Sequence, residues 1–371
     1  MNNNPNLSEF KLLGITMSKP NLLVLSAITT TTVAYLYFAT DGYAQNAWNL
    51  QLEPMYLEVG GANVLHSQTI TQTYPADSTN SFPSAYIQQK FEFDGNITFR
   101  GQLEYMPEEW GIGVSGWWFD TSDTLGQNLT IPSTPNYTTF SYTTYDSINT
   151  SASFGPDGGT LKTSAKSKLN LWNVDVYGIK SLCKFNYGQI NLTFGAKFGG
   201  INNRTSELMQ SENNFGDINL SRSESSSRSS NANILVGPSV GFQTLGDYGT
   251  HHLQGLLNQA ILIGNVNRNQ NYSGVAYWNS PYTLFSDYNS FADNSDYSET
   301  LVIPVTDIKI KYSYDLTENL SLGLGVFASI WVNTPTSNGN NVYTLSAESG
   351  AHTNYKTLVF YGGLSSINLK F

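Results

Sequence analysis

Strict alternation of apolar and polar residues recurs along this chain and limits most strongly what it can form. In 189–198, for example, Ile190, Leu192 and Phe194 alternate with polar residues such as Asn191. A side-chain period of two is typical of β-strands that have one apolar and one polar face. Segments of about ten residues are long enough to cross a lipid bilayer as tilted strands. No segment after residue 44 reads as a membrane-spanning helix, so this part of the chain could cross a membrane only as a closed barrel.

The links between the predicted strands alternate in length along the chain. Short links, such as 186–188 and 315–319, alternate with long ones, such as 202–230 and 333–350. An up-and-down barrel with both ends in the periplasm has short periplasmic turns and long extracellular loops, whereas a soluble sandwich has no reason to sort its loops. The sequence therefore predicts an all-β fold, a transmembrane antiparallel up-and-down β-barrel of about ten strands (8–12). The Ser-rich stretch 221–230 falls in a long link and is predicted to be mobile. The predicted strands are 48–59, 97–105, 112–120, 171–185, 189–198, 233–245, 253–264, 302–314, 320–332 and 357–371.

The composition suits strands that face lipid on one side and water on the other. Only 12% of the residues are charged and 13% are aromatic, whereas charged residues make up about 25% of an average chain. The net charge of −10 argues against nucleic acid as a partner, because phosphate binding needs a basic surface. Cys183 is the single cysteine, which excludes an intramolecular disulfide and a cysteine-based zinc site. We therefore expect neither a cofactor nor a metal.

The N-terminal segment 1–44 is predicted to be a signal peptide, followed by an outer-membrane β-barrel over 45–371. Residues 21–38 are nearly free of charge and mostly apolar, and 42–44 supply small residues at positions −3 and −1 of a cleavage site. Met17 is a second candidate start, because the extension before it is unusual for a signal peptide. A single transmembrane anchor is the alternative, and four consecutive threonines make it the weaker one.

The chain ends in a strand-like alternation that stops on an aromatic residue. Ile367 and Leu369 alternate with Asn368 and Lys370 before the terminal Phe371. In bacterial outer-membrane barrels the final strand closes the cylinder, and its ending is read by the barrel-assembly machinery. We therefore predict that the protein lies in the bacterial outer membrane. Its predicted partners are the lipid bilayer, the barrel-assembly machinery and small solutes, but no nucleic acid.

Eight charged residues are predicted to line the lumen, because they lie on the polar faces of the predicted strands. Four are acids and four are bases, so they set no clear ion preference. The alternative is that they pair with one another and brace a narrow interior, since side chains fill the inside of small barrels. The predicted lumen-lining residues are Glu53, Arg100, Glu104, Asp175, Lys197, Asp307, Lys309 and Lys311.

Aromatic residues gather near the ends of the predicted strands. We interpret them as girdles at the two membrane interfaces, which barrels of this kind need, rather than as a track for sugars. The predicted interface aromatics are Trp48, Tyr105, Trp110, Trp118, Trp172, Tyr314 and Phe371, with Tyr56, Tyr177, Tyr312 and Tyr361 nearby.

Several short segments resemble the Legionella-type major outer-membrane proteins. Residues 93–105 and 110–115 look like the first hairpin of that family. Residues 236–242 are similar to its Gly-Pro-x-x-Gly strand, and 302–308 resemble its Val-Pro-Val-x-Asp-Leu strand. The region of Trp331 resembles the aromatic end of the next strand, while the loops do not match the family. The resemblance implies a pore-forming outer-membrane protein and supplies no catalytic residues.

The sequence predicts a passive pore for small solutes or ions. An adhesin or structural surface protein with a plugged lumen is the alternative, and a soluble secreted sugar-binding sandwich is a third hypothesis. An enzyme is not expected, because the histidines show no spacing that indicates a catalytic site and no Gly-x-Ser-x-Gly motif is present. The four histidines are His66, His251, His252 and His352.

Overall fold

The computed structural model is built of β-strands. No helix in the part of the chain it describes is long and apolar enough to cross a membrane. The residues it describes are 9–12, 15–18, 48–62, 64–74, 82–107, 109–131, 137–144, 149–154, 157–215, 218–279, 287–335 and 355–371.

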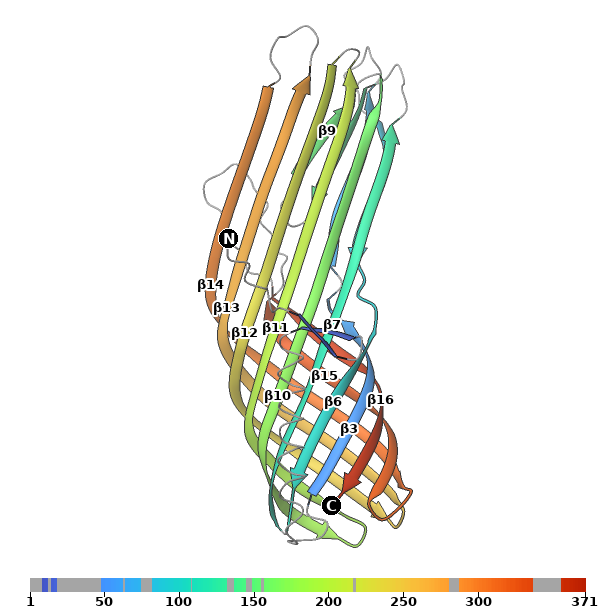
Figure 1. Cartoon of the computed structure of the whole chain (residues 1–371), viewed down its shortest axis with the longest axis vertical. Coiled ribbons are helices and arrows are strands. Elements are labelled where there is room, and N and C mark those ends of the chain that lie inside the picture. The colour runs from blue at the N-terminus through green and yellow to red at the C-terminus, as the bar shows by residue number, and fades with distance from the viewer. Residues whose placement is uncertain are drawn as a thin grey trace.

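Ten strands form a closed antiparallel barrel (Figure 1). Each strand pairs with the barrel strands that precede and follow it in the chain, and the last strand pairs with the first. At this seam the backbone N–H of Trp48 donates to the carbonyl of Phe371, and the N–H of Phe371 donates to the carbonyl of Trp48. The predicted up-and-down barrel and all ten predicted strands are thereby confirmed. The strands are β3 (Trp48–Gly60), β6 (Asn96–Tyr105), β7 (Trp110–Ile131), β10 (Gly159–Phe185), β11 (Gly188–Phe215), β12 (Ile218–Tyr248), β13 (His251–Asn279), β14 (Asp287–Asp315), β15 (Leu320–Pro335) and β16 (Tyr355–Lys370).

Five neighbouring strands are much longer than the sequence predicts. β10 to β14 contain 27, 28, 31, 29 and 29 residues, and their upper parts rise beyond the rest of the barrel (Figure 1). The prediction that 221–230 is mobile was wrong, because this Ser-rich stretch lies inside β12 and pairs with both β11 and β13. Serine has a low intrinsic preference for strands, but hydrogen-bonded pairing with a strand on each side stabilises the extended conformation here.

A second sheet is formed by two segments that connect barrel strands, one between β3 and β6 and one between β7 and β10. It has four strands in the order β5-β4-β8-β9. β5 contacts β7 and β9 contacts β11, so this sheet lies against the long strands. A short hairpin, β1 (Glu9–Leu12) with β2 (Ile15–Ser18), lies in the predicted signal peptide, whose cleavage region is outside the described residues. The four strands of the second sheet are β4 (Val64–Tyr74), β5 (Phe82–Phe91), β8 (Tyr137–Thr144) and β9 (Asn149–Phe154).

The outer surface of the barrel is apolar. All ten barrel strands place exposed aliphatic or aromatic side chains on it. On β13 these run from Leu253 to Ile263, about 33 Å along the strand. At a strand tilt of about 40° this covers about 25 Å, the height of the apolar band of outer-membrane barrels. A closed barrel with such a belt satisfies every backbone group in lipid, so the belt marks the membrane-spanning part.

The outward face changes from apolar to polar along one row of paired residues on six strands. Trp118, Trp172, Ile263 and Val302 are among the last large apolar residues below this row. Cross-strand pairing joins the members of the row, which are Asp120, Asn170, Asn202, Asn231, Asn267 and Ser298. We call the parts of β7 and β10 to β14 beyond this row the upper wall, and the opposite end, which holds the C-terminus, the lower end (Figure 1).

We expect an arginine in the apolar belt to destabilise the membrane-inserted protein. Val326 is 57% exposed on the outer face of β15, so Val326→Arg should lower the free energy of unfolding from lipid vesicles by about 2–4 kcal/mol. Asn267→Arg, on the outer face beyond the polar row, should change it by less than about 0.5 kcal/mol. Urea titration followed by tryptophan fluorescence measures both variants. Equal effects of the two substitutions would mean that the belt does not face lipid.

Candidate functional site

The barrel interior holds all eight charged residues that the sequence assigns to the lumen. None of them is more than 7% exposed. Because isolated charges are costly to bury, each has to be matched by partners inside the barrel. The eight come from β3, β6, β10, β11 and β14, so the network joins strands on different sides of the lumen.

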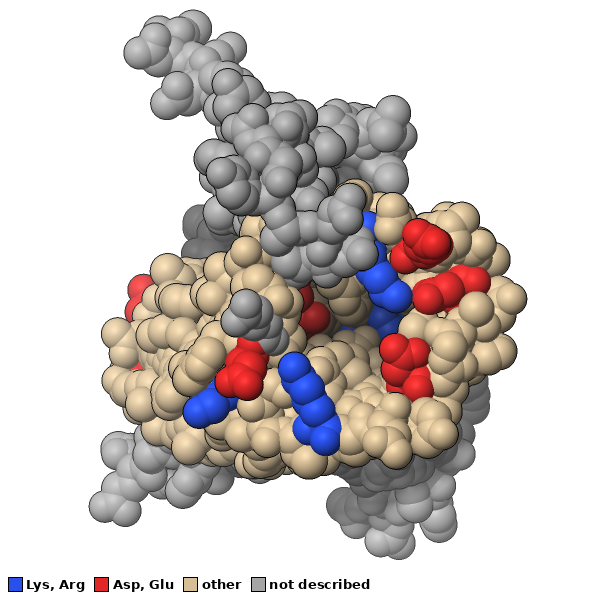
Figure 2. Space-filling view, turned by 90° about the horizontal axis from the view of Figure 1, so that it is seen from below, with Lys and Arg blue, Asp and Glu red and all other residues tan. Residues whose placement is uncertain are grey.

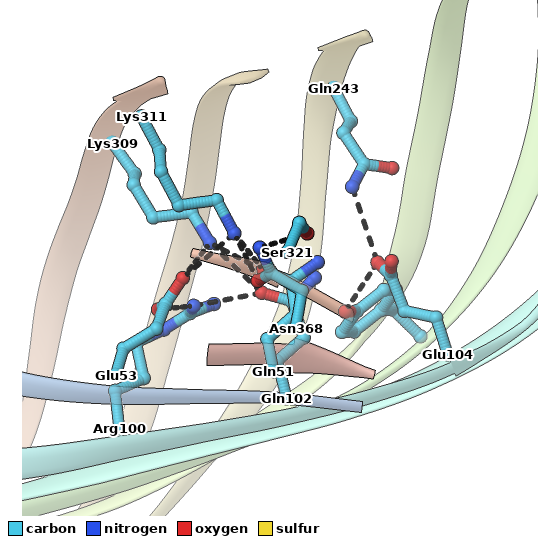
Figure 3. Close-up of polar contacts among 11 residues, drawn as sticks. Gln51, Glu53, Arg100, Gln102, Glu104, Gln243, Lys309, Lys311, Ser321 and Asn368 are labelled. Atoms are coloured by element: carbon cyan, nitrogen blue, oxygen red, sulfur yellow. Dashed lines mark hydrogen bonds and ion pairs between the residues drawn. The ribbon is translucent and has the colours of Figure 1, made fainter. Parts of the chain in front are cut away.

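Glu53 is the centre of the first cluster. Its Oε2 accepts from Arg100 Nη1 at 2.5 Å, and its Oε1 lies 2.9 Å from Lys309 Nζ and 3.4 Å from Lys311 Nζ. Gln51 and Gln102 accept further hydrogen bonds from these bases, as Figure 3 shows. One carboxylate therefore holds three bases that come from β6 and β14.

Lys197 is the centre of the second cluster. Its Nζ donates to Asp175 Oδ2 and Asp307 Oδ2, both at 2.6 Å. Ser329 Oγ donates to the other oxygen of Asp307 at 2.5 Å, and Asn258 donates to Asp175 at 3.4 Å. This cluster ties β10, β11, β13, β14 and β15 together across the interior.

Glu104 is the last of the eight and is held by neutral donors. Tyr177 Oη donates to Glu104 Oε1 at 3.0 Å and Gln243 Nε2 donates to the same oxygen at 3.3 Å. Tyr177 therefore lies inside the barrel, and the prediction that it belongs with the interface aromatics was wrong. Tyr177 follows Asp175 by two residues and therefore shares its inward face, while Val176 between them is 51% exposed on the outside.

An apolar layer lies next to the charged clusters inside the barrel. Trp117 packs edge-on against Phe327 and Phe360, with ring centroids 5.6 and 5.5 Å apart, and Phe119 packs against Phe360 at 5.2 Å. Trp331 joins the layer and donates its Nε1–H to Ser329 Oγ at 2.9 Å. Smaller apolar side chains from the other strands complete it, including Met55, Leu57, Leu171, Ile201, Leu235, Leu262 and Ile303.

An open space lies inside the barrel on the lower side of the charged clusters. A pocket of about 730 Å³ is lined by Gln51, Lys311, Asn368 and His252, among others. Figure 2, which looks into this end, shows the hollow with basic side chains inside its mouth. Deeper in, the cavity beside Arg100 and Trp117 has a volume of about 20 Å³, which is room for about one water molecule. The lower vestibule therefore ends at the charged clusters.

The predicted interface aromatics point outward from the barrel strands at two levels. Trp48 packs against Tyr105 with ring centroids 4.6 Å apart near the lower end, and Trp118 pairs with Trp172 at the upper edge of the belt. Trp110 precedes Trp118 by eight residues on β7, about 20 Å of height at the usual tilt. The lower level also holds Tyr314 and Phe371, which are 43% and 39% exposed.

The histidines whose side chains are described lie at the lower end. His251 Nδ1 is 2.6 Å from Tyr312 Oη, and His252 Nε2 is 2.7 Å from Asp315 Oδ2. The second ring nitrogen of His252 faces Asp247 at 3.5 Å, so both nitrogens are directed at carboxylates. The side chain of His66 and the whole of His352 lie outside the described residues. Within the described part of the chain no group of three or more His, Cys, Asp or Glu could hold a metal ion.

Comparisons with known proteins identify no family. No family model matches the chain, and no curated protein matches it significantly. The resemblance to the Legionella-type major outer-membrane proteins, and the expectation that the protein is not an enzyme, stay predictions.

Among solved structures, similar chains are bacterial outer-membrane barrels. The outer-membrane protease OmpT from Escherichia coli is 14% identical, with 90% of this chain and 100% of that chain covered and a TM-score of 0.36. The transport unit of the autotransporter AIDA-I from Escherichia coli is 12% identical, with 94% and 98% covered and a TM-score of 0.24. The toluene transporter TodX from P. putida is 8% identical, with 89% and 91% covered and a TM-score of 0.20. These TM-scores are below 0.5, so the similarities assign no activity.

We expect removal of the Glu53 charge to destabilise the protein strongly. Glu53→Gln leaves Arg100, Lys309 and Lys311 without their shared carboxylate, and breaking a buried ion pair from one side costs about 3–5 kcal/mol of unfolding free energy. Urea titration followed by tryptophan fluorescence measures the loss.

Glu318→Gln is the matched control, because Glu318 is an exposed turn residue and the charge change is the same. It should change stability by less than about 0.5 kcal/mol. Adding Lys309→Met to Glu53→Gln should recover part of the loss, because it removes one uncompensated base. A loss at Glu53 no larger than at Glu318 would show that the cluster does not brace the barrel.

Proposed function

We propose that this protein is an outer-membrane β-barrel with a sealed lumen that serves as a structural or adhesive surface protein. The observation that carries the proposal is the pair of layers inside the barrel, where ion-paired side chains lie against packed aromatic rings. This is the alternative among the hypotheses drawn from the sequence, and the packed interior supports it over the open pore.

A passive pore needs a continuous aqueous path, and the interior works against one in two ways. Each of the eight lumen charges has a partner in the barrel, and four acids against four bases leave no net charge to attract ions. Beyond them the rings of Trp117, Phe327 and Phe360 are in contact across the lumen. A hydrophobic constriction stops ion flow by excluding water, even where it is wide enough for an ion.

The upper wall supports a role at the cell surface. Short turns join the strands at the lower end, which corresponds to the periplasmic side of outer-membrane barrels. The upper wall would then project from the cell, with its polar outer face available to other molecules. In this proposal the strand that ends at Phe371 is also the segment read by the barrel-assembly machinery.

Conductance across a planar lipid bilayer tests the seal. The protein refolded in detergent should insert and show no discrete conductance steps. Trp117→Ala combined with Phe360→Ala should produce steps, because it removes two contacting rings from the apolar layer and one of them, Trp117, is also a wall of the small cavity among the charged side chains.

The control pair is Trp118→Ala with Tyr361→Ala, which changes the next residue of each strand but on the outer face. This variant should stay silent. Heat-modifiable migration on gels establishes that each variant is folded before it is added to the bilayer. Reproducible steps from the unmodified protein would reject the sealed barrel in favour of the pore.

A further inference from the structure

Four basic residues form a strip on the outer face of the upper wall. Lys162, Lys166 and Lys168 lie on β10, and Arg204 lies opposite Lys168 on β11. Their side chains are exposed, and they point outward because the residues between them, such as Ala165, are buried inside. We call these four residues the basic strip.

The basic strip begins immediately beyond the apolar belt. Trp172 is the last large apolar outward residue of β10, and Lys168 lies four residues further along the same face, about 13 Å along the strand. Phe198 ends the belt on β11, and Arg204 follows it. Lys168 and Arg204 therefore lie nearest the polar headgroups of the lipid leaflet that surrounds the upper end of the belt, and Lys166 and Lys162 follow further out on the same face.

Most of this charge has no protein counterion. Lys168 Nζ lies 3.5 Å from Asp120 Oδ2, but Lys162, Lys166 and Arg204 form no ion pair among the described residues. Like charges directly opposite one another on neighbouring strands destabilise a sheet, and Lys168 and Arg204 are such a pair. In a chain with a net charge of −10, a concentration of bases at this position calls for an anionic partner.

The face beside the basic strip is neutral and rich in hydrogen-bonding groups. Arg204 pairs with Ser229, and Ser229 pairs with Asn269 on β13. One row above, Ser206 pairs with Ser227, and Ser227 with Asn271. Regular rows of hydroxyl and amide groups on a sheet suit the hydroxyls of sugars, which both donate and accept hydrogen bonds.

We propose that this face of β10 to β13 binds a phosphorylated glycolipid of the outer leaflet. The lipid phosphates lie on the basic strip, the acyl chains lie against the apolar belt below it, and the sugars lie along the Ser and Asn rows. The inference rests on the proposed function only in that the protein is inserted in the membrane with the upper wall outside. It holds whether the lumen is sealed or open.

Binding of diphosphorylated lipid A to the refolded protein tests the proposal. The protein is placed in phosphatidylcholine nanodiscs with increasing fractions of diphosphoryl lipid A, and the lipid retained is counted by native mass spectrometry. Lys162→Gln, Lys166→Gln and Arg204→Gln together should weaken retention on the order of a hundredfold, since each base near an anionic surface contributes about fivefold. Lys168 is left in place because it pairs with Asp120.

A matched triple substitution at the lower end is the control. Lys180→Gln, Lys184→Gln and Lys370→Gln remove the same charge from the same strand and from β16, far from the upper wall. This variant should retain lipid A as the unmodified protein does. We call the triple substitution in the basic strip the upper variant. An equal loss of lipid retention in both triple variants would show that only the net charge of the protein matters. No loss of lipid retention in the upper variant would overturn the proposal.

Two further ligands distinguish binding of the phosphorylated lipid from binding of a free phosphate compound. Lipid A without its phosphates should bind the unmodified protein as weakly as diphosphoryl lipid A binds the upper variant. Inositol hexakisphosphate should compete poorly, because it has no acyl chains to lie on the belt, and full competition at equal concentration would assign the basic strip to soluble polyphosphates instead. Heat-modifiable migration and insertion into phosphatidylcholine vesicles report on the barrel itself, so failure of lipid binding is distinguishable from failure of membrane insertion.

Discussion

Closure of the sheet through β16 and β3 is the constraint on which the rest of this structure depends. In lipid, an unpaired strand edge would leave a row of backbone groups without partners, at several kcal/mol for each group. The pairing of β16 with β3, completed by the two hydrogen bonds between Trp48 and Phe371, removes both edges at once. Once the cylinder is closed, alternate side chains of every strand have to fill its interior, and the others have to face the membrane.

Two kinds of packing fill the interior, and they differ in how strictly each side chain depends on one particular partner. The ion-paired layer is specific, because each charge is costly unless its partner is in place, as with Glu53 among its three bases. The aromatic layer is less directional and fills volume while excluding water. Together they join strands far apart in the sequence, such as β3 and β14. The proposed seal and the bracing of the barrel therefore have the same physical origin.

Much of this arrangement follows from side-chain parity, that is, from the rule that successive residues of a strand point to opposite faces. The sequence shows this alternation directly. Parity places the eight charged residues inside, and it also assigns Phe327 and Trp331 to the face of Ser329, where the aromatic layer forms. Alternation cannot show whether such side chains meet across the lumen, because that depends on barrel width and rotamers. The long extensions of β10 to β14 could not be read either. Their outward faces are rich in Ser, Asn and Lys, a composition that is typical of loops, and these segments form strands because they pair on both sides.

Both faces of the long strands change character at nearly the same level. On β14 the inward face passes from Asp307 to Val305, Ile303 and Leu301. The outward face passes from Val302 to the exposed Thr300. The apolar interior layer therefore lies toward the upper edge of the membrane belt, and the wet vestibule of about 730 Å³ opens at the other end. In the proposed sealed barrel, this layer separates the vestibule from the upper wall. The wall can then vary its outer chemistry without changing the residues that hold the barrel closed, because the two sets occupy opposite faces of the same strands.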